Sequence, residues 1–326
     1  MRPTRARLPR LVRATPALAA VVVLAVSGCG AEGSDPGGAG TTGSPTADPS
    51  ALEAPVPMDP GEPPTVRLVD AGLGTGRVLA HLPSRGESEA AVTVSGTRST
   101  SVAGAAPRRD DTPEQTLTLR GESQPDVDGA VRQTVHATGF TSTDDSRSAQ
   151  FATAEGFGVT WVRAADGTVR SAALEAPGRA TDAARAGVET TTADLDAAAV
   201  VFPHEPVAVG ARWEVTRRVA DGVAPTRVDA YELTALDGDV ATLRVRTTAP
   251  VESRTLRGPA PDGGATVALD VKTYEAGGEA TWTVDLRAPL PRSGRSTQTT
   301  KAVYVDPGTG TQTTFDSSRT LAITSR

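Results

Sequence analysis

From residue 65 onward, apolar and polar residues alternate along the chain in short runs that are separated by turn residues. This alternation is typical of strands that bury one face, and the Thr and Val residues in these runs favour the extended conformation. We expect strands at 77–82, 90–97, 115–121 and 131–140. The pattern predicts a mainly β protein with antiparallel pairing, because the runs are short and closely spaced.

Four further pairs of alternating runs are predicted to form hairpins. In two of them the turn is Asp-Gly, which is among the strongest short-range hairpin signals because both central residues of such a turn need φ > 0. The predicted turns are Asp166–Gly167 within 158–174, Asp237–Gly238 within 231–247, Gly277–Gly278 between 265–274 and 279–286, and Pro307–Gly308 within 302–315.

One segment, 181–201, shows no strand alternation and is predicted to be an amphipathic helix. Thr181 is a suitable N-cap, Pro203 ends the segment, and Gly187 weakens the helix by about 1 kcal/mol relative to Ala. The apolar stripe that would face a sheet is Ala184, Val188, Leu195 and Ala199. The fold class we expect is therefore mainly β, with an antiparallel curved sheet or sheets, as a sandwich or half-barrel, and one helix near 181–201.

The helix divides the strands into a front group, 65–175, and a back group, 207–326. Small residues precede Trp161 in one group and Trp282 in the other, which raises the question of an internal duplication. Two short matches in a chain rich in Gly, Thr and Val leave that question open. The tryptophans themselves lie inside alternating runs, so we expect Trp161, Trp213 and Trp282 to pack in the core, with a groove-lining role as the alternative.

The N-terminal residues predict where the protein resides. Five arginines between residues 2 and 13 precede an apolar run at 14–26, which is shorter than the roughly 20 residues of a membrane-spanning helix. The run ends in Val26, Ser27, Gly28 and Cys29, which resembles the lipobox of bacterial lipoprotein signal peptides. By that resemblance, residues 1–28 are a signal peptide and Cys29 carries a diacylglycerol. The expected location is the extracytoplasmic face of the cell membrane, held there by acyl chains.

Residues 29–64 differ in composition from the rest of the chain. They contain almost no large apolar side chains and are dense in Gly, Pro, Ser and Thr. Such a segment cannot bury enough apolar surface to offset its ordering entropy, so we expect a disordered tether. The β-rich extracytoplasmic domain is expected to occupy 65–326.

Charge and composition limit the classes of molecule that the protein is expected to bind. Without residues 1–28 the chain holds 28 basic and 39 acidic residues, a formal charge of −11. Nucleic acid is therefore an unsuitable partner, since phosphate contacts supply most of the affinity of such complexes. The chain has two lysines against 31 arginines and no Asn. This bias is typical of a high-GC genome of the actinobacterial kind, so the number of arginines does not itself indicate anion binding.

The sequence contains no recognisable catalytic or metal-binding constellation. His81, His136 and His204 lie far apart, Cys29 is the only cysteine, and there is no Gly-x-Ser-x-Gly or Ser-x-x-Lys motif. We expect no enzymatic activity, no metal and no cofactor. Five acidic pairs are interpreted as solvated loop residues: Asp110–Asp111, Asp126–Asp128, Asp144–Asp145, Asp194–Asp196 and Asp237–Asp239.

The segment 202–215 follows the predicted helix. We expect a Pro-bounded turn, then a strand entered through Val207 and Val209 with a bend at Gly210. The pattern Pro-x-x-Pro-Val-x-Val-Gly-x-x-Trp, in which Pro206 is the second proline and Trp213 the last residue, resembles a family of uncharacterised bacterial lipoproteins. That resemblance implies a β-rich domain of this size behind a lipobox and a tether, and it implies no activity. A weaker likeness, in architecture only, is to the LolA-like and LprG-like lipoprotein carriers.

Two functions remain open. The first is a lipid-anchored, non-catalytic module that presents its β-rich surface to a protein or to a cell-wall partner. The second is a module that binds or carries an apolar ligand, such as a lipid, between a curved sheet and the helix. A filled core with an exposed apolar patch would favour the first, and an empty groove under the helix would favour the second.

Overall fold

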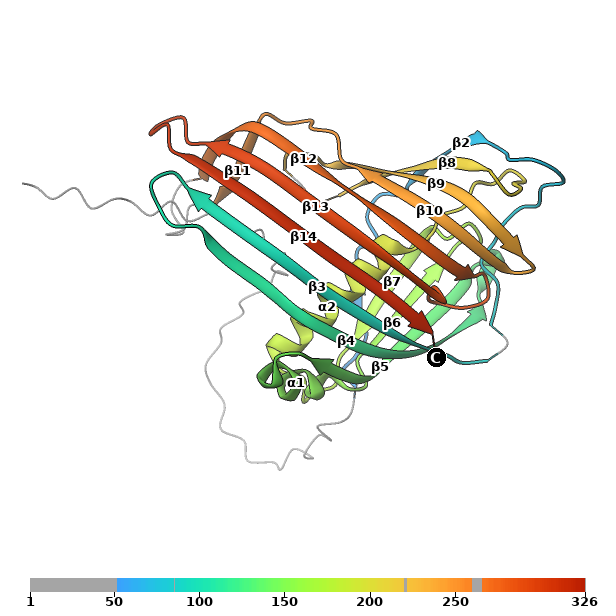
Figure 1. Ribbon diagram of the computed structural model, residues 1–326. Helices are drawn as coiled ribbons and strands as arrows, with labels where there is room; N and C mark the ends of the chain where they lie inside the picture. Colours follow the sequence, from blue (N-terminus) through green and yellow to red (C-terminus); the bar gives the residue numbers. More distant parts are fainter. Residues whose placement is uncertain (1–51, 85, 220–221, 260–265, 326) are drawn as a thin grey trace, which may run out of the picture.

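The computed structural model describes residues 52–84, 86–219, 222–259 and 266–325. One large curved antiparallel sheet holds the strands, and a single longer helix lies on its concave side (Figure 1). The first strands are β1 (Val56–Met58), β2 (Thr65–Asp70), β3 (Ser88–Val102), β4 (Arg108–Pro125), β5 (Val131–Ser142), β6 (Gly158–Arg163) and β7 (Val169–Glu175). The remaining strands are β8 (Arg212–Arg218), β9 (Thr226–Asp237), β10 (Val240–Thr248), β11 (Thr255–Pro259), β12 (Thr266–Asp285), β13 (Ser293–Val305) and β14 (Gln312–Ser325).

The strand order is β1-β7-β6-β5-β4-β3-β14-β13-β12-β10-β9-β8-β2, with β11 added beside β12. The last strand, β14, pairs with β3 over thirteen residue positions, from Thr313 opposite Val102 to Ser325 opposite Ala90. This pairing joins the front strands to the back strands in one sheet. Within the described residues the edge strands β1 and β2 do not pair with each other, so the sheet is curved but open. The expected mainly β, antiparallel, curved architecture is confirmed.

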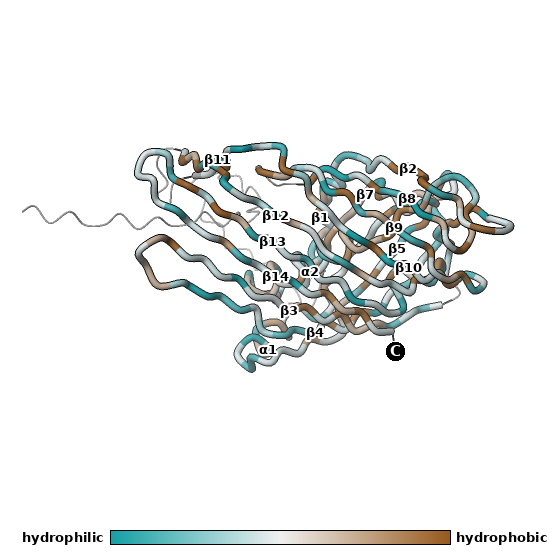
Figure 2. The backbone as a smooth tube through the Cα atoms, turned by 45° about the horizontal axis from the view of Figure 1, so that its top comes forward, coloured by the Kyte–Doolittle hydropathy of each residue, from teal (hydrophilic) through white to brown (hydrophobic). Residues whose placement is uncertain are grey.

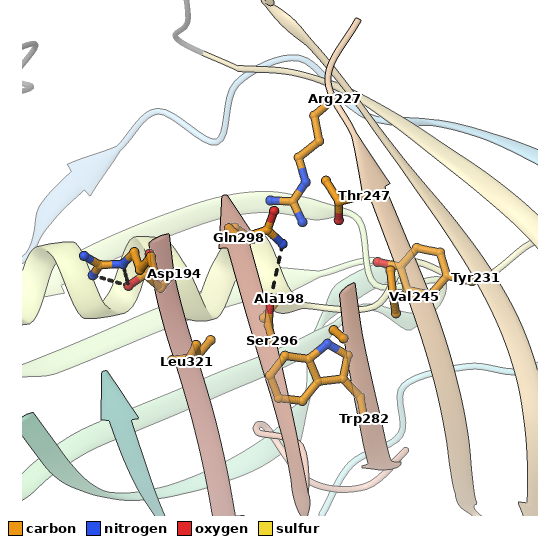
Figure 3. A pocket seen from close by; sticks show the side chains of 13 residues that line it. Asp194, Ala198, Arg227, Tyr231, Val245, Thr247, Trp282, Ser296, Gln298 and Leu321 are labelled. Atoms are coloured by element: carbon orange, nitrogen blue, oxygen red, sulfur yellow. Dashed lines mark hydrogen bonds and ion pairs between the residues drawn. The ribbon is translucent and has the colours of Figure 1, made fainter. Parts of the chain in front are cut away.

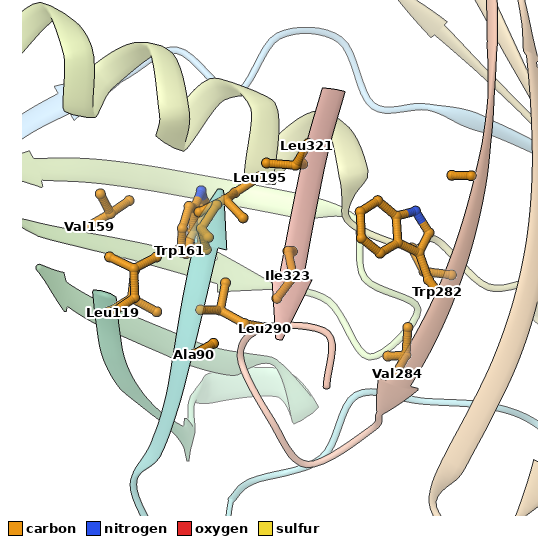
Figure 4. Close-up of a cluster of buried hydrophobic side chains, with 14 of the residues drawn as sticks. Ala90, Leu119, Val159, Trp161, Leu195, Trp282, Val284, Leu290, Leu321 and Ile323 are labelled. Carbon is orange, nitrogen blue, oxygen red and sulfur yellow. The ribbon is translucent and has the colours of Figure 1, made fainter. Parts of the chain in front are cut away.

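The helix α2 (Asp182–Ala198) begins where the sequence predicts. The hydroxyl of Thr181 accepts a hydrogen bond from the backbone N–H of Ala184 at 3.3 Å. Ala184, Val188 and Leu195 of the predicted stripe are buried, whereas Ala199 is the C-cap residue just beyond the helix. Figure 4 shows Leu195 above Trp161 of β6 and next to Leu321 of β14. The space between α2 and this part of the sheet is therefore filled with side chains.

The core consists mostly of Val, Leu and Ala, with the three tryptophans as its largest members. Trp161, Trp213 and Trp282 are each no more than 2% exposed, so the prediction that they pack in the core is confirmed. Hydropathy alternates along the long strands of the sheet, as the colouring of β12, β13 and β14 shows (Figure 2). Because successive residues face opposite sides of a sheet, this alternation gives one buried and one solvated face.

The predicted hairpin at Gly277–Gly278 is wrong. Both glycines lie inside the continuous 20-residue strand β12, which pairs along its length with β10, β11 and β13. A Cβ at Gly278 would collide with the carbonyl oxygen of Thr297, and one at Gly277 would lie 2.7 Å from the carbonyl oxygen of Thr247. Glycine is needed here because neighbouring backbones approach closely on both sides, and not because the chain turns.

Two of the other predicted turns are confirmed, and one is shifted. Strands β6 and β7 are joined through 164–168 around Asp166–Gly167, and strands β13 and β14 through 306–311 around Pro307–Gly308. Between β9 and β10 the turn residues are Gly238 and Asp239, because Asp237 still pairs with Val240. Gly167 and Gly238 adopt positive φ, whereas the two aspartates do not.

The prediction of a strand at 77–82 is also wrong. Its backbone N–H groups donate to three separate segments: Arg77 to Val207, His81 to Ala165, and Leu82 to Leu286. Burial alternates as in a strand, because Leu79 and His81 are both buried, but no single partner strand accompanies the segment. The strands predicted at 90–97, 115–121 and 131–140 are confirmed within β3, β4 and β5.

The sequence did not lead us to expect the short helix α1 (Asp145–Phe151). Asp144 caps it, accepting a hydrogen bond from the backbone N–H of Ser146 at 3.0 Å. Its last residue, Phe151, stacks on Phe140 of β5 with ring centroids 4.2 Å apart. A cavity of about 510 Å³, part of it open to solvent, lies between α1 and strands β4 and β5. Neither α1 nor α2 has the length and apolarity to cross a bilayer, a statement that covers the described residues only.

Candidate functional site

The predicted anchor residues, Val26, Ser27, Gly28 and Cys29, lie outside the described residues. The anchor therefore stays a prediction from the lipobox. The other predicted motif, Pro206 to Trp213, is described in full and lies at the junction of the α2 exit and the sheet. It is the first of two places where the structure concentrates features that point to binding.

The prediction that a strand is entered through Val207 and Val209 is wrong. Val207 is fully buried and forms an isolated antiparallel bridge with Arg77, whereas Val209 and Gly210 lie in a turn. Strand β8 starts only at Arg212. Gly210 has φ +89° and its N–H donates to the carbonyl of Leu233 at 2.7 Å, so the predicted bend is present.

Trp213 locks this motif to the core. Its indole N–H donates to the carbonyl of Val201 at 2.9 Å, and its ring is fully buried. The ring stacks on Tyr231 of β9 with centroids 5.2 Å apart, and Phe202 lies 6.2 Å away on another side. The segment that leaves α2 is thus tied to β8 and β9 by one side chain.

The motif also supports an exposed apolar loop between β2 and residue 78. Leu73 at the loop tip is 89% exposed, and its N–H donates to the carbonyl of Val209 at 3.1 Å. Val69 and Val78 flank the loop and, like Val209, are exposed. We call Val69, Leu73, Val78 and Val209 the apolar tip.

Backbone geometry holds the apolar tip in place. The N–H of Ala208 donates to the carbonyl of Ala71 at 2.8 Å, and the N–H of Gly72 donates to the Asp70 carboxylate at 2.9 Å. Gly72 has φ +82° and approaches Ala208 so closely that no side chain fits there. The loop therefore presents the large apolar side chain of Leu73 to solvent from a backbone that these hydrogen bonds hold in place.

The second place is a pocket on the concave face beside the C-terminal part of α2 (Figure 3). Its empty volume is about 530 Å³, part of it open to solvent. It is lined by Asp194, Ala197, Ala198, Arg227, Tyr231, Val245, Thr247, Ala280, Trp282, Ser296, Gln298, Arg319 and Leu321. The lining comes from α2 and from β9, β10, β12, β13 and β14, so no short stretch of sequence identifies it.

A buried carboxylate organises one side of this pocket. Asp229 of β9 is fully buried, and it accepts hydrogen bonds from the Thr247 hydroxyl at 2.6 Å and the Arg227 Nε–H at 2.9 Å. Arg217 Nε lies 3.9 Å from Asp229 Oδ2, an oxygen that has no hydrogen-bond partner. Two guanidinium groups thus face one carboxylate.

Two more arginines bind acids of α2. Arg163 is buried, donates to Asp196 at 2.8 Å and to Gln133 at 3.0 Å, and lies over the ring of Trp161. Arg319 of β14 donates to Asp194 at 2.8 Å. Burial raises the pKa of Asp194, and the guanidinium of Arg319 opposes that rise. The acidic pair Asp194–Asp196, expected to be solvated, instead fixes α2 to the sheet.

Burial also shifts the pKa values of two side chains in this region, Tyr231 and His81. It raises the pKa of Tyr231 to about 12, so this phenol stays neutral. Burial, together with the nearby positive charge of Arg163, lowers the pKa of His81 to about 4. The Nε2 of His81 lies 3.3 Å from the carbonyl of Val200, whereas Nδ1 is buried without a hydrogen-bond partner.

The other predicted polar residues do not converge on a site. His204 is largely exposed, in keeping with the predicted solvated turn, and His136 lies on β5. Asp126 caps the 3-10 turn that follows β4 and binds Arg132 at 2.7 Å. Within the described part of the chain, no three His, Cys, Asp or Glu side chains come together as a metal site.

Two comparisons with known proteins found no match for this chain. No family model matches it. No curated protein matches it at a significant level. Function must therefore be argued from the apolar tip and the pocket alone.

Proposed function

We propose that this protein is a lipid-anchored module on the extracytoplasmic face of the cell membrane, and that it works by docking to an envelope protein. Cys29 would carry the anchor, and the β-rich domain would present the apolar tip. The proposal assigns no chemistry to the domain. The observation that carries it is the apolar tip itself, with Leu73 89% exposed on a backbone fixed by hydrogen bonds.

The filled space under α2 supports the same choice. Ala184, Val188 and Leu195 are buried against the sheet, and the three tryptophans occupy the core. With the core filled, the exposed apolar side chains of the apolar tip are left for contact with a partner, which is the role that we propose for them. When a partner buries apolar residues at such a surface, the complex is stabilised by about 25 cal/mol for each Å² of apolar surface removed from water.

Photo-crosslinking in intact cells tests the docking. A benzophenone amino acid replaces Leu73 in one strain and Val127 in another. Val127 is a matched control because it is also a large apolar residue and is 71% exposed, in the turn after β4. We expect one discrete protein adduct from position 73 and none from position 127. The same adducts from both positions, or lipid adducts alone from position 73, would contradict docking to a protein.

A second function is favoured by the pocket beside α2. Trp282, Val245 and Leu321 give it an apolar wall, and polar side chains from β9, β10 and β13 face the same space. We propose binding of a ligand with an apolar body in this pocket as the alternative function. Native mass spectrometry of the protein purified from its host tests it. A stoichiometric bound ligand supports this function, and a mass equal to that of the protein alone argues against it.

A further inference from the structure

The pocket beside α2 has both polar and apolar side chains in its lining, which also includes the charged pair Asp194 and Arg319. Figure 3 shows the side chains of Arg227, Thr247 and Gln298 grouped on one side and those of Trp282 and Leu321 on the other. An apolar ligand alone would leave the guanidinium of Arg227 facing an uncharged group in a partly dehydrated site. Such a ligand would remove water from the part of the guanidinium that Asp229 does not bind, and this loss of hydration costs binding free energy.

Asp229 holds the Arg227 side chain without cancelling the positive charge around it. The carboxylate is fully buried and binds Arg227 through Nε, so the guanidinium is anchored by one edge. The Arg227 side chain is 20% exposed, and its guanidinium points into the pocket (Figure 3). Arg217 lies on the other side of the same carboxylate. Two cations around one anion leave a local excess of positive charge in a chain whose net charge is negative.

The hydroxyl of Thr247 also serves this arrangement. It donates to Asp229 at 2.6 Å and so helps to fix the carboxylate that orients Arg227. A guanidinium held in a fixed plane is a preorganised donor pair for an oxyanion, since its N–H groups match the two oxygens of a carboxylate or phosphate. The orientation of Arg227 is fixed before any ligand arrives, which lowers the entropy lost on binding.

From this geometry we infer that the pocket binds an oxyanion attached to a short apolar body, a carboxylate or a phosphate monoester. Arg227 takes the oxyanion, and Trp282 and Leu321 contact the apolar body. This inference rests on the alternative function proposed above, ligand binding beside α2, and it adds the charge of the ligand. It is independent of the apolar tip.

The test compares four probes on the full chain carrying Cys29→Ser, so that no detergent competes for the pocket. The probes are octanoate, octyl phosphate, 1-octanol and acetate. Calorimetry gives the affinities, and the indole N–H signal of Trp282, assigned with Trp282→Phe, reports whether a probe enters this pocket. We expect octanoate or octyl phosphate to bind roughly tenfold or more tightly than 1-octanol, as a charge-assisted pair implies. The tighter of the two anions identifies the head group, and acetate alone should bind too weakly to detect.

Substitutions of Arg227 test whether this residue binds the oxyanion of the ligand. Arg227→Gln should reduce octanoate affinity to that of 1-octanol, and Arg227→Lys should retain part of the preference. Arg244→Gln is the matched control, since Arg244 is an exposed arginine of β10 paired with Glu232. If Arg227→Gln does not fold because Asp229 loses its partner, Arg227→Gln with Asp229→Asn removes both charges together. Ala198→Trp should block the pocket and abolish binding of every probe.

The outcomes separate the inference from the function on which it rests. Equal affinity for octanoate and 1-octanol, with the Trp282 signal shifting in both cases, would support ligand binding in this pocket. It would overturn the inference that the ligand carries an oxyanion. Absence of binding by all probes would overturn both. An anion preference that persists in Arg227→Gln would overturn the assignment to Arg227.

Discussion

At the scale of single residues, Trp213 joins three parts of the fold: the exit of α2, β8 and β9. Truncation to Ala removes a fully buried ring, its stack on Tyr231 and the hydrogen bond to Val201. We expect Trp213→Ala to lower the free energy of unfolding by about 3–5 kcal/mol, the usual cost of deleting a large core ring. Equilibrium unfolding in urea measures the change.

A matched control for Trp213 lies four residues away in the same motif. Val209 is 45% exposed, so Val209→Ala should change the free energy of unfolding by less than about 0.5 kcal/mol. A near-wild-type stability of Trp213→Ala would mean that the motif is not tied to the core through this ring. Comparable losses in both variants would mean that the turn, and not the ring, carries the stability.

His81 makes stability depend on pH. Its folded-state pKa of about 4 lies below the 6.5 of an exposed histidine, because burial and Arg163 disfavour the charged form. The unfolded chain therefore binds the proton more tightly between these two values, and the free energy of unfolding rises with pH across this window. The contribution is complete above pH 6.5 and is lost as the pH falls toward 4.

Urea unfolding at pH 7.5 and pH 4.5 measures this dependence. We expect His81→Leu to lose less stability than the wild type between the two pH values, by about 2–3 kcal/mol, because the variant has no imidazole to protonate. Carboxylates titrate identically in both proteins and cancel in the comparison. Equal pH dependence of the two proteins would show that His81 is protonated without cost in the folded state.

At the scale of elements, α2 shows how packing reverses a local preference. Gly187 weakens a helix by about 1 kcal/mol relative to Ala, so helix propensity alone favours Gly187→Ala. In the structure, a Cβ at this position collides with the ring of Phe151 of α1. We expect Gly187→Ala to lower the free energy of unfolding by about 1–2 kcal/mol, since overpacking outweighs the propensity gain.

Two comparisons make this prediction specific, both by urea unfolding. The double variant Gly187→Ala with Phe151→Leu should be less destabilised than the sum of its single variants, because each change relieves the other. Ala186→Gly, at an exposed neighbouring position, should cost about 1 kcal/mol from propensity alone. A stabilised Gly187→Ala would mean that the Phe151 ring moves aside freely.

The elements that the sequence predicted are those whose signal is local. The N-cap Thr181 and a stripe of apolar residues at helical spacing indicate α2. A glycine between two alternating runs indicates the turns at Gly167 and at Pro307–Gly308. The failures depend on distant partners. Gly277 and Gly278 look like a turn until β10 and β13 are placed beside them, and 77–82 alternates like a strand although its hydrogen bonds go to three segments.

The candidate sites divide in the same way, into features with a local sequence signal and features that depend on residues distant in the sequence. The motif ending in Trp213 could be found in the sequence, and its core role is confirmed. The apolar tip could not, because the exposure of Leu73 depends on how 206–210 braces the loop. Nor could the pocket, since Arg227, Thr247 and Trp282 are brought together only by the order of β9, β10 and β12. Asp229, in the middle of a strand, carries no sequence signal for a buried charge network.

At the scale of the whole molecule, the proposed anchor and the apolar tip are expected to make separable contributions. The chain without residues 1–28 has a formal charge of −11, so attraction to anionic lipid does not hold it to a membrane. In the proposed arrangement, retention at the membrane would therefore depend on acyl chains at Cys29. From Cys29 to Leu52, where the described chain begins, the polypeptide can span at most about 80 Å, at ~3.3–3.6 Å per residue. In the proposed arrangement, a span of this length would let the domain contact an envelope protein away from the bilayer.

Cell fractionation with two variants tests this separation. Cys29→Ser should move the protein from the membrane fraction to the soluble fraction, because a serine cannot carry the thioether-linked lipid. Leu73→Ser should leave the protein in the membrane fraction and abolish the partner adduct captured by a crosslinker placed at Val78, another exposed residue of the apolar tip. Cys29→Ser protein that stays with washed membranes would contradict the lipid anchor. Leu73→Ser protein that leaves the membrane would show instead that the apolar tip itself binds lipid, and the partner would be the bilayer.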